Sequence, residues 1–140
     1  MNNTEIFEAY FDAFEAAYQD DQWDRLLHFF TDDMVYNNVE GESLKGRTAA
    51  IDYLEASVNA SDRKFDSRGL DDVDIVGDGD TVTMAFTVRY QIAGAPDLVI
   101  SGRETATFRD GRIEQMDDIF HDASLTQFGA WMEIHAGLLA

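Results

Sequence analysis

The sequence has few or none of the residues on which several classes of protein depend. Its 140 residues include no cysteine, one proline and two lysines, Lys45 and Lys64. The lack of cysteine excludes a disulfide framework and thiolate catalysis. No stretch approaches the roughly 20 apolar residues of a membrane span, so no membrane association is expected. The first residues carry acids and no basic segment before an apolar run, which is unlike a secretory signal, and we therefore expect a cytoplasmic protein.

Basic residues are scarce as a group. Ten lysines and arginines stand against 28 aspartates and glutamates, giving a formal net charge of −18. Nucleic-acid binding is excluded because no basic stripe could neutralise phosphates. The acids are spread along the whole chain, which is typical of a solvated surface and of adaptation to a salty cytoplasm. A basic partner protein is the alternative interpretation.

Several catalytic and binding motifs are also missing. His28, His121 and His135 lack the spacing of a metal site, and the acidic turn 77–80 lacks the ligand order and terminal glutamate of an EF-hand. No glycine-rich phosphate loop and no Gly-x-Ser-x-Gly nucleophile motif occurs. We therefore expect neither a metal nor a cofactor.

The residues that are present suffice for one folded domain, residues 1–140. Hydrophobic residues make up 45% of the chain, unlike a disordered segment. A chain of this length buries roughly 68–70% of its unfolded surface and can build a core without disulfides. No repeat, linker or low-complexity segment divides it.

Apolar residues recur at two periods along the chain. Spacings of three and four predict helices over residues 4–18, 23–30, 47–60 and 125–139, the first capped by Asn3 or Thr4. Alternation predicts strands over residues 34–39, 64–76, 81–92, 98–108 and 112–120, with a loop at 41–46.

Three helices followed by consecutive strands indicate the α+β class. We expect the helices to pack on a curved, mostly antiparallel sheet and to leave a space between the two layers. Residues 122–140 form a C-terminal helical extension. Its apolar stripe is compatible with ordinary core packing, with closure of the pocket mouth, or with docking on a second subunit.

Acidic side chains on apolar faces are the candidates for chemistry. Alternation places Glu104 on the same face as Ile100 and Phe108, where a carboxylate rarely lies without a partner or purpose. Desolvation would raise its pKa, allowing proton exchange near neutral pH. The alternative is a buried acid paired with an arginine of a neighbouring strand.

Asp118 is a second inward candidate. Neither face of the strand 112–120 is cleanly apolar, but Met116 and Phe120 share the parity of Asp118, which leaves Asp117 toward solvent. On the strand 34–39, Tyr36 and Asn38 share a face and together could hold a water or a substrate oxygen. A polar strand end capped by an Asx turn is the alternative for that pair.

Three segments resemble enzymes of the NTF2-like superfamily. The run FTDDMVYNN, followed by KGRTAAI, resembles their first strand and third helix, and FRDGRIEQMDDIF resembles their final hairpin. The group includes SnoaL-type polyketide cyclases, ketosteroid isomerases and limonene-epoxide hydrolases. The resemblance extends to about residue 122. It implies a cone-shaped, cystatin-like fold, a homodimer, and a pocket for a small apolar organic molecule.

The resemblance to ketosteroid isomerase is incomplete in the site. Glu104 matches the acid of its oxyanion hole, but Asn38 stands in place of its proton-shuttling aspartate. Phe14 falls near the place of its oxyanion-hole tyrosine. Because an amide cannot act as a base, an isomerase of that type is not expected.

The resemblance to limonene-epoxide hydrolase covers a different part of the site. Tyr36 and Asn38 match the pair that holds the attacking water, and Asp118 matches the aspartate that deprotonates it. Phe86 and Val88 replace the arginine and the acid that protonate the epoxide. SnoaL-type cyclases also place an aspartate near Asp118, and their pattern is the least contradicted.

These features together predict cofactor-free general acid–base chemistry, with Asp118 as the base and Glu104 as the acid. Tyr36 and Asn38 would hold a water. Cyclisation, isomerisation and water addition all remain open. A non-catalytic small-ligand-binding or dimerising accessory module is the alternative. The expected pocket residues are mostly aromatic or apolar: Tyr10, Phe14, Trp23, Tyr53, Met84, Phe86, Val88, Met116 and Phe120.

Overall fold

The aromatic-rich start of the chain forms helix α1 (Asn3–Asp20) in the computed structural model, which describes residues 1–140. Asn2, rather than Asn3 or Thr4, caps this helix. Its side chain accepts a hydrogen bond from the backbone N–H of Glu5, and the Glu5 carboxylate accepts one from the backbone N–H of Asn2. This reciprocal capping box satisfies two N–H groups that the helix itself cannot pair.

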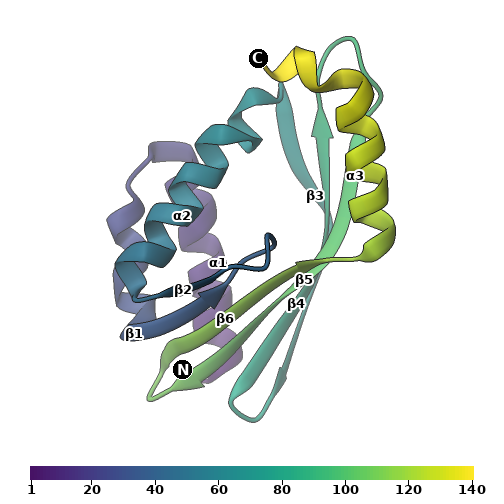
Figure 1. The fold of residues 1–140 in the computed structure, drawn as a ribbon. Coiled ribbons are helices and arrows are strands. Elements are labelled where there is room, and N and C mark those ends of the chain that lie inside the picture. The colour runs from purple at the N-terminus through teal and green to yellow at the C-terminus, as the bar shows by residue number, and fades with distance from the viewer.

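The predicted helices and strands follow in the expected order, together with two short elements, at residues 43–45 and 62–64, that were not predicted (Figure 1). The helical ones are η1 (Trp23–Phe29), α2 (Arg47–Ala60), η2 (Asp62–Lys64), α3 (Asp122–His135) and η3 (Ala136–Leu139). The strands are β1 (Phe30–Asn37), β2 (Ser43–Lys45), β3 (Ser67–Asp78), β4 (Thr81–Gln91), β5 (Leu98–Arg109) and β6 (Arg112–Phe120).

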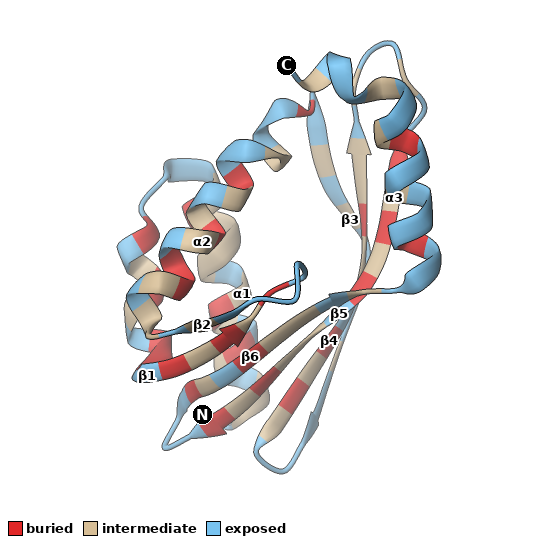
Figure 2. Ribbon diagram, viewed as in Figure 1, coloured by how far each residue is buried: buried red, intermediate tan, exposed pale blue.

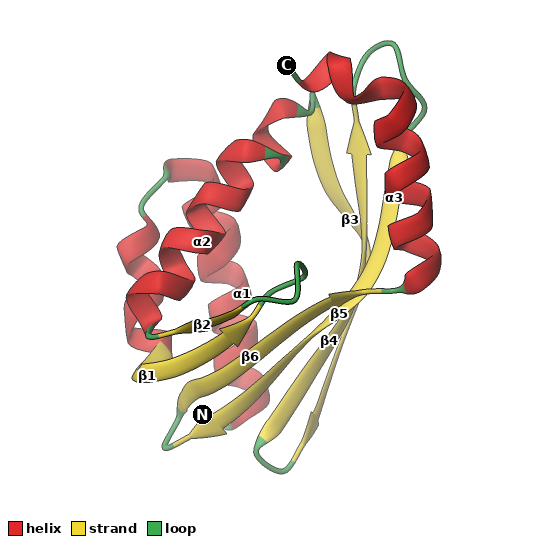
Figure 3. Cartoon of the chain, viewed as in Figure 1, coloured by secondary structure: helices red, strands yellow, loops and turns green.

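The six strands form one curved sheet in the order β2-β1-β6-β5-β4-β3. Strands β3 to β6 are an antiparallel meander, and β1 joins it by pairing in parallel with β6. Figure 3 shows α1 and α2 on the concave side of this sheet, with α3 against the far end of β5. The expected α+β architecture, with helices on a curved and mostly antiparallel sheet, is confirmed.

Some boundaries differ from the sequence predictions. Residues 23–29 form a 3-10 helix instead of an α-helix. Strand β1 begins at Phe30, four positions before the predicted Met34, because Phe30 already pairs with Ile113 of β6. The predicted loop 41–46 contains the short strand β2, whose Leu44 pairs with Tyr36. These features cannot be predicted from local periodicity, because each depends on pairing with a distant strand or on tertiary packing.

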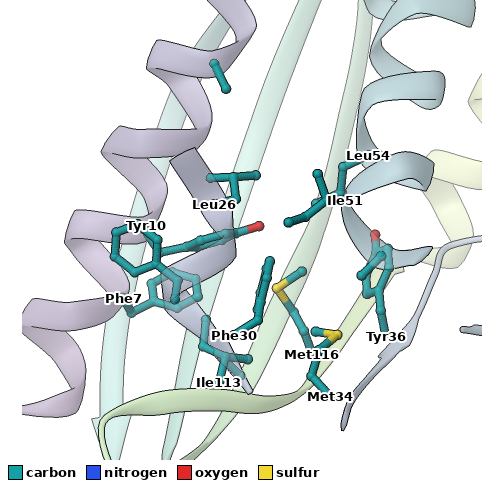
Figure 4. Close-up of a cluster of buried hydrophobic side chains, with 14 of the residues drawn as sticks. Phe7, Tyr10, Leu26, Phe30, Met34, Tyr36, Ile51, Leu54, Ile113 and Met116 are labelled. Atoms are coloured by element: carbon teal, nitrogen blue, oxygen red, sulfur yellow. The ribbon is translucent and has the colours of Figure 1, made fainter. Parts of the chain in front are cut away.

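Two apolar clusters hold the layers together. The larger lies between α1, η1, α2 and one end of the sheet, and Figure 4 shows its side chains converging from these elements. The smaller surrounds Trp131 of α3, which packs on Phe65 and donates a hydrogen bond from Nε1 to the Pro96 carbonyl at 2.9 Å. The C-terminal helix therefore belongs to the core. Figure 2 shows that buried residues occur along the helices and along the strands of the sheet, so both layers contribute to the core. No helix has the length and apolarity needed to cross a membrane.

Gly102 of β5 lies directly opposite Phe120 of β6. A Cβ atom at this position would lie 2.2 Å from the Ile119 carbonyl oxygen and 3.1 Å from Phe120 Cα. Because both atoms belong to backbone, they cannot move aside as a flexible side chain would.

We expect Gly102→Ala to lower the free energy of unfolding by about 1–3 kcal/mol through overpacking. Urea denaturation monitored by circular dichroism checks this value. Gly69→Ala on β3 is the matched control, because nothing lies within 4 Å of its Cβ position. Equal denaturation midpoints for the two variants would contradict the close approach.

Candidate active site

A cavity of about 500 Å³ lies between the helices and the concave face of the sheet. This volume is within the range of small-molecule sites. Its wall is built from α1, α2, the loop after β1, the inner face of β3 to β6, and Leu125 and Phe128 of α3. Most lining side chains are apolar or aromatic. A second hollow, about 710 Å³, is open to solvent and lined only by polar residues near Thr31 and Arg109, so it offers no enclosure for a substrate.

Most of the predicted pocket residues line this cavity. Besides Glu104, Asp118 and Tyr36, the wall includes Tyr10, Phe14, Tyr53, Met84, Phe86, Val88 and Phe120. Alternation along β4 turns its even-numbered residues inward, and the edge-to-face contact of Phe86 with Phe120, at 6.3 Å between ring centres, forms part of the wall.

Three predicted residues, Trp23, Met116 and Asn38, are not brought to the cavity. Trp23 packs behind Phe14, edge to face at 5.6 Å, and its Nε1 donates to Asp21. Met116 is fully buried in the larger core. Alternation identifies the inward face of a strand but does not distinguish core positions from cavity positions.

Asn38 is occupied by its own loop. Its Oδ1 accepts hydrogen bonds from the backbone N–H groups of Glu40 and Glu42, both at 3.0 Å, and its Nδ2 donates to the Glu42 carboxylate. These contacts match the Asx-turn interpretation of a polar strand end. We therefore leave Asn38 out of the proposed site.

The centre of the site is a pair of carboxyl groups on adjacent strands. Glu104 of β5 is directly opposite Asp118 of β6 in the antiparallel register, and both line the cavity. Tyr36 reaches the pair from β1 because the parallel pairing sets it beside Met116, and its hydroxyl donates a hydrogen bond to Asp118 Oδ2. No ion pair joins either acid to a basic residue, which argues against the alternative of an arginine partner for Glu104.

The two carboxyl groups have unequal proton affinities. Burial raises the pKa of Glu104 well above its ordinary value, and the negative charge of Asp118 raises it further. Burial also raises the pKa of Asp118, but interactions with Glu104 and the Tyr36 hydroxyl oppose that rise. Of the two groups Glu104 therefore holds a proton more strongly, and Asp118 is the one that ionises first.

Two further polar groups complete the site. Asp118 Oδ1 is buried and has no amide, hydroxyl or basic donor, so its hydrogen bond comes from the protonated carboxyl group of Glu104 opposite. Tyr10 is only 2% exposed, lines the cavity, and makes no hydrogen bond to another residue. Figure 4 shows its hydroxyl directed from α1 toward Ile51 and Leu54 of α2. Burial and the nearby charges of Glu104 and Asp118 raise the Tyr10 pKa, so the hydroxyl keeps its proton and can donate it.

A second polar cluster at the cavity wall was not predicted. Arg68 of β3 donates to both carboxylate oxygens of Glu15, at 3.0 and 3.2 Å, and its Nε lies 3.3 Å from Asp62 Oδ2. The Tyr90 hydroxyl donates to Asp62 Oδ1 at 3.2 Å. All four residues line the cavity. The only signal in the sequence was the inward parity of Tyr90, since the cluster joins four separate elements.

The comparisons with known proteins agree with this architecture. A sequence profile described as the SnoaL-like domain matches residues 7–116. The chain belongs to the SnoaL-like domain family. No curated protein sequence matches it significantly.

Solved structures of SnoaL-like proteins share the fold at low identity. A candidate polyketide cyclase from Xanthomonas campestris pv. campestris is 20% identical over 93% of this chain and 98% of its own, with a TM-score of 0.68. A candidate SnoaL-like polyketide cyclase from Shewanella putrefaciens CN-32 is 13% identical over 96% and 88%, with a TM-score of 0.69. TerC, crystallised with polyporic acid, is 17% identical over 94% and 99%, with a TM-score of 0.67.

The raised pKa of Glu104 has a consequence for stability. The folded state keeps this group protonated to a higher pH than the unfolded chain does, so it binds more protons between the two pKa values. The free energy of unfolding therefore falls as the pH rises through that window, which begins near the ordinary glutamate pKa of about 4.3.

Glu104→Gln should therefore stabilise the protein at neutral pH, by about 1.4 kcal/mol for each pH unit between the ordinary glutamate pKa and either the folded-state pKa or the assay pH, whichever is lower. The gain should shrink as the pH falls toward about 4, because both states are then protonated. Denaturation curves across this pH range measure the difference in the free energy of unfolding between the variant and wild type. Glu133→Gln is the control, because it removes the same charge at an exposed position. A Glu104→Gln protein that is less stable at every pH would show that the carboxylate is favourably paired.

Proposed function

We propose that this SnoaL-like protein is a cofactor-free enzyme that performs general acid–base chemistry on a small, largely apolar organic substrate. The observation that supports this most directly is the cross-strand pair of Glu104 and Asp118 in an apolar cavity. Two acids with unequal proton affinities can remove a proton from one atom and deliver one to another.

Asp118 is the proposed base. It gives up its proton more readily than Glu104 does, and Tyr36 holds one of its carboxylate oxygens in place. Tyr36 itself stays protonated, because burial and the neighbouring acids raise its pKa far above the physiological range. Its role is to position the carboxylate, while Asp118 Oδ1, which otherwise accepts from the Glu104 carboxyl group, can take a proton once Glu104 donates to the substrate instead.

Glu104 and Tyr10 are the proposed donors to a substrate oxygen. Removing a proton next to a carbonyl, or adding an activated nucleophile to one, places negative charge on that oxygen. Protonated Glu104 and the free Tyr10 hydroxyl can both donate to it without reorganising in the transition state. Tyr10 therefore supplies from a neighbouring turn of α1 the hydroxyl that Phe14 lacks.

The residues fit cyclisation, isomerisation and water addition, all of which need one proton removed and one delivered. The names of the structural relatives favour cyclisation, and TerC shows that an organic molecule co-crystallises with this fold. As the family resemblance implies, we also propose a homodimer. The outer face of the sheet, which no helix covers, exposes Ile119 and is the surface available for it.

The test is turnover of a cyclic epoxide, a β,γ-unsaturated ketone and a polyketide-like methyl ester by wild type and variants. We expect Asp118→Asn to lose roughly 10²–10⁴-fold in kcat on the accepted substrate, with the melting temperature maintained. Tyr10→Phe should lose less, because it removes one of two donors to the oxygen.

Asp117→Asn is the matched control, one residue away on the same strand. Its carboxylate accepts hydrogen bonds from Asn37 and Gln115 and does not line the cavity. Equal turnover by Asp118→Asn and Asp117→Asn would remove Asp118 from the mechanism. No turnover by folded wild type, together with binding of the same compounds, would instead favour a non-catalytic ligand-binding module.

A further inference from the structure

The charges that line the cavity are strongly unbalanced. One basic residue, Arg68, belongs to the wall. The acidic residues of the wall are Glu15, Glu40, Asp62, Glu104 and Asp118. Even with Glu104 protonated, the carboxylates outnumber the one guanidinium. Charges in a partly enclosed cavity with apolar walls are screened less than charges on an open surface, so the interior has a negative potential.

Arg68 does not relieve this imbalance for a bound molecule. Both of its terminal nitrogens are held by Glu15, and its Nε faces Asp62. Its side chain is 12% exposed, compared with 31% for Glu15 and 20% for Asp62. The cluster has two carboxylates for one guanidinium. The side chains of the two acids are also more exposed than that of the arginine. An anionic group would therefore meet repulsion with no free cation to bind it.

The same end of the cavity has aromatic walls. Phe65 and Tyr90 pack with ring centres 4.7 Å apart, and both line the cavity beside Asp62. Further along, Phe86 and Phe120 continue the aromatic surface toward Glu104 and Asp118. Aromatic faces attract cations, more strongly where water is excluded. The carboxylates and the aromatic rings at this end of the cavity therefore both favour a positively charged group.

Tyr10 offers the cavity a hydrogen-bond donor. Its side chain is almost completely buried, but its hydroxyl lines the cavity and makes no hydrogen bond to another residue. The hydroxyl is therefore free to donate to an oxygen of a bound molecule in place of water. The best place for an oxygen of the ligand is near Tyr10 and Glu104.

We infer that the substrate of this site is an apolar molecule with a protonated amine at one end and a reacting oxygen function at the other. The ammonium group lies at the end of the cavity formed by Glu15, Asp62 and Tyr90. The oxygen function lies at Tyr10, Glu104 and Asp118. This assignment rests on the proposed function for the reacting end only, since the amine end is argued from charge and aromatic contacts alone.

The test compares three probes with the same aromatic body and different charge: naphthylmethylamine, naphthylmethanol and naphthylacetate. Their binding to the wild-type protein is measured by isothermal titration calorimetry at low and high salt. We expect the amine to bind about tenfold more tightly than the alcohol, and the carboxylate to bind more weakly than either. The order should persist at high salt, where attraction to the overall negative surface is screened.

Asp62→Asn should lower the amine affinity about three- to tenfold and leave the alcohol affinity unchanged. Asp74→Asn is the matched control: it removes the same charge from an exposed position on β3 outside the cavity. An alcohol or carboxylate that binds wild type as tightly as the amine would overturn the inference. So would equal losses of amine affinity in Asp62→Asn and Asp74→Asn.

The inference and the proposed function fail separately. Amine-selective binding without turnover of any amine-bearing ketone or ester would support the binding assignment and count against catalysis. Turnover that depends on Asp118, with no preference for a basic nitrogen in the substrate, would support catalysis and reject the amine end.

Discussion

The register between β5 and β6 sets Glu104 opposite Asp118, and the rest of the site is arranged around that pairing. Two facing carboxyl groups that are shielded from solvent disfavour a state in which both are ionised, so the pair favours holding a proton. An ordinary core would replace such a pair by apolar residues or supply an arginine. This fold supplies the Tyr36 hydroxyl instead, which favours ionisation of Asp118 and leaves the proton on Glu104.

The parallel pairing of β1 with β6 is what brings Tyr36 to that place. It sets Tyr36 beside Met116, one inward position before Asp118, and Tyr53 of α2 packs edge to face on the Tyr36 ring at 5.7 Å. The hydroxyl is thus fixed by a strand on one side and a helix on the other. A site on two rigid strands and a packed tyrosine is better defined than one on loops.

The cavity exists because the two apolar clusters do not merge. The larger fills the space between α1, α2 and the β1 end of the sheet, and the smaller joins α3 to Phe65 and the far ends of β4 and β5. The curvature of the sheet turns these two clusters toward each other without closing the gap. Phe86 packs against both of them, and it forms the wall where they meet.

The inward direction of Glu104 and Asp118 could be predicted because strand periodicity requires only local sequence. The contact between them could not, since it depends on register across a hairpin. Alternation along a strand is also insufficient for Asn38. This residue has the expected parity, but its side-chain oxygen and nitrogen are both hydrogen-bonded to the loop that follows. The helices and strands were predictable for the same local reason, whereas the β1–β6 pairing and the Arg68 cluster join segments far apart in the chain.

The acidic residues on the surface and those in the cavity have different physical effects, although the net charge of the sequence combines them. Surface carboxylates are solvated, and at physiological ionic strength their field decays within about 8 Å. They influence solubility and the approach of ligands but cannot select among ligands inside a pocket. Asp62, Glu15 and Asp118 are enclosed by protein, where neither water nor counter-ions screen them fully. A net charge of −18 would allow the lining to be neutral or even basic. That it is also acidic, with its one arginine already occupied by Glu15, is a separate property of this site.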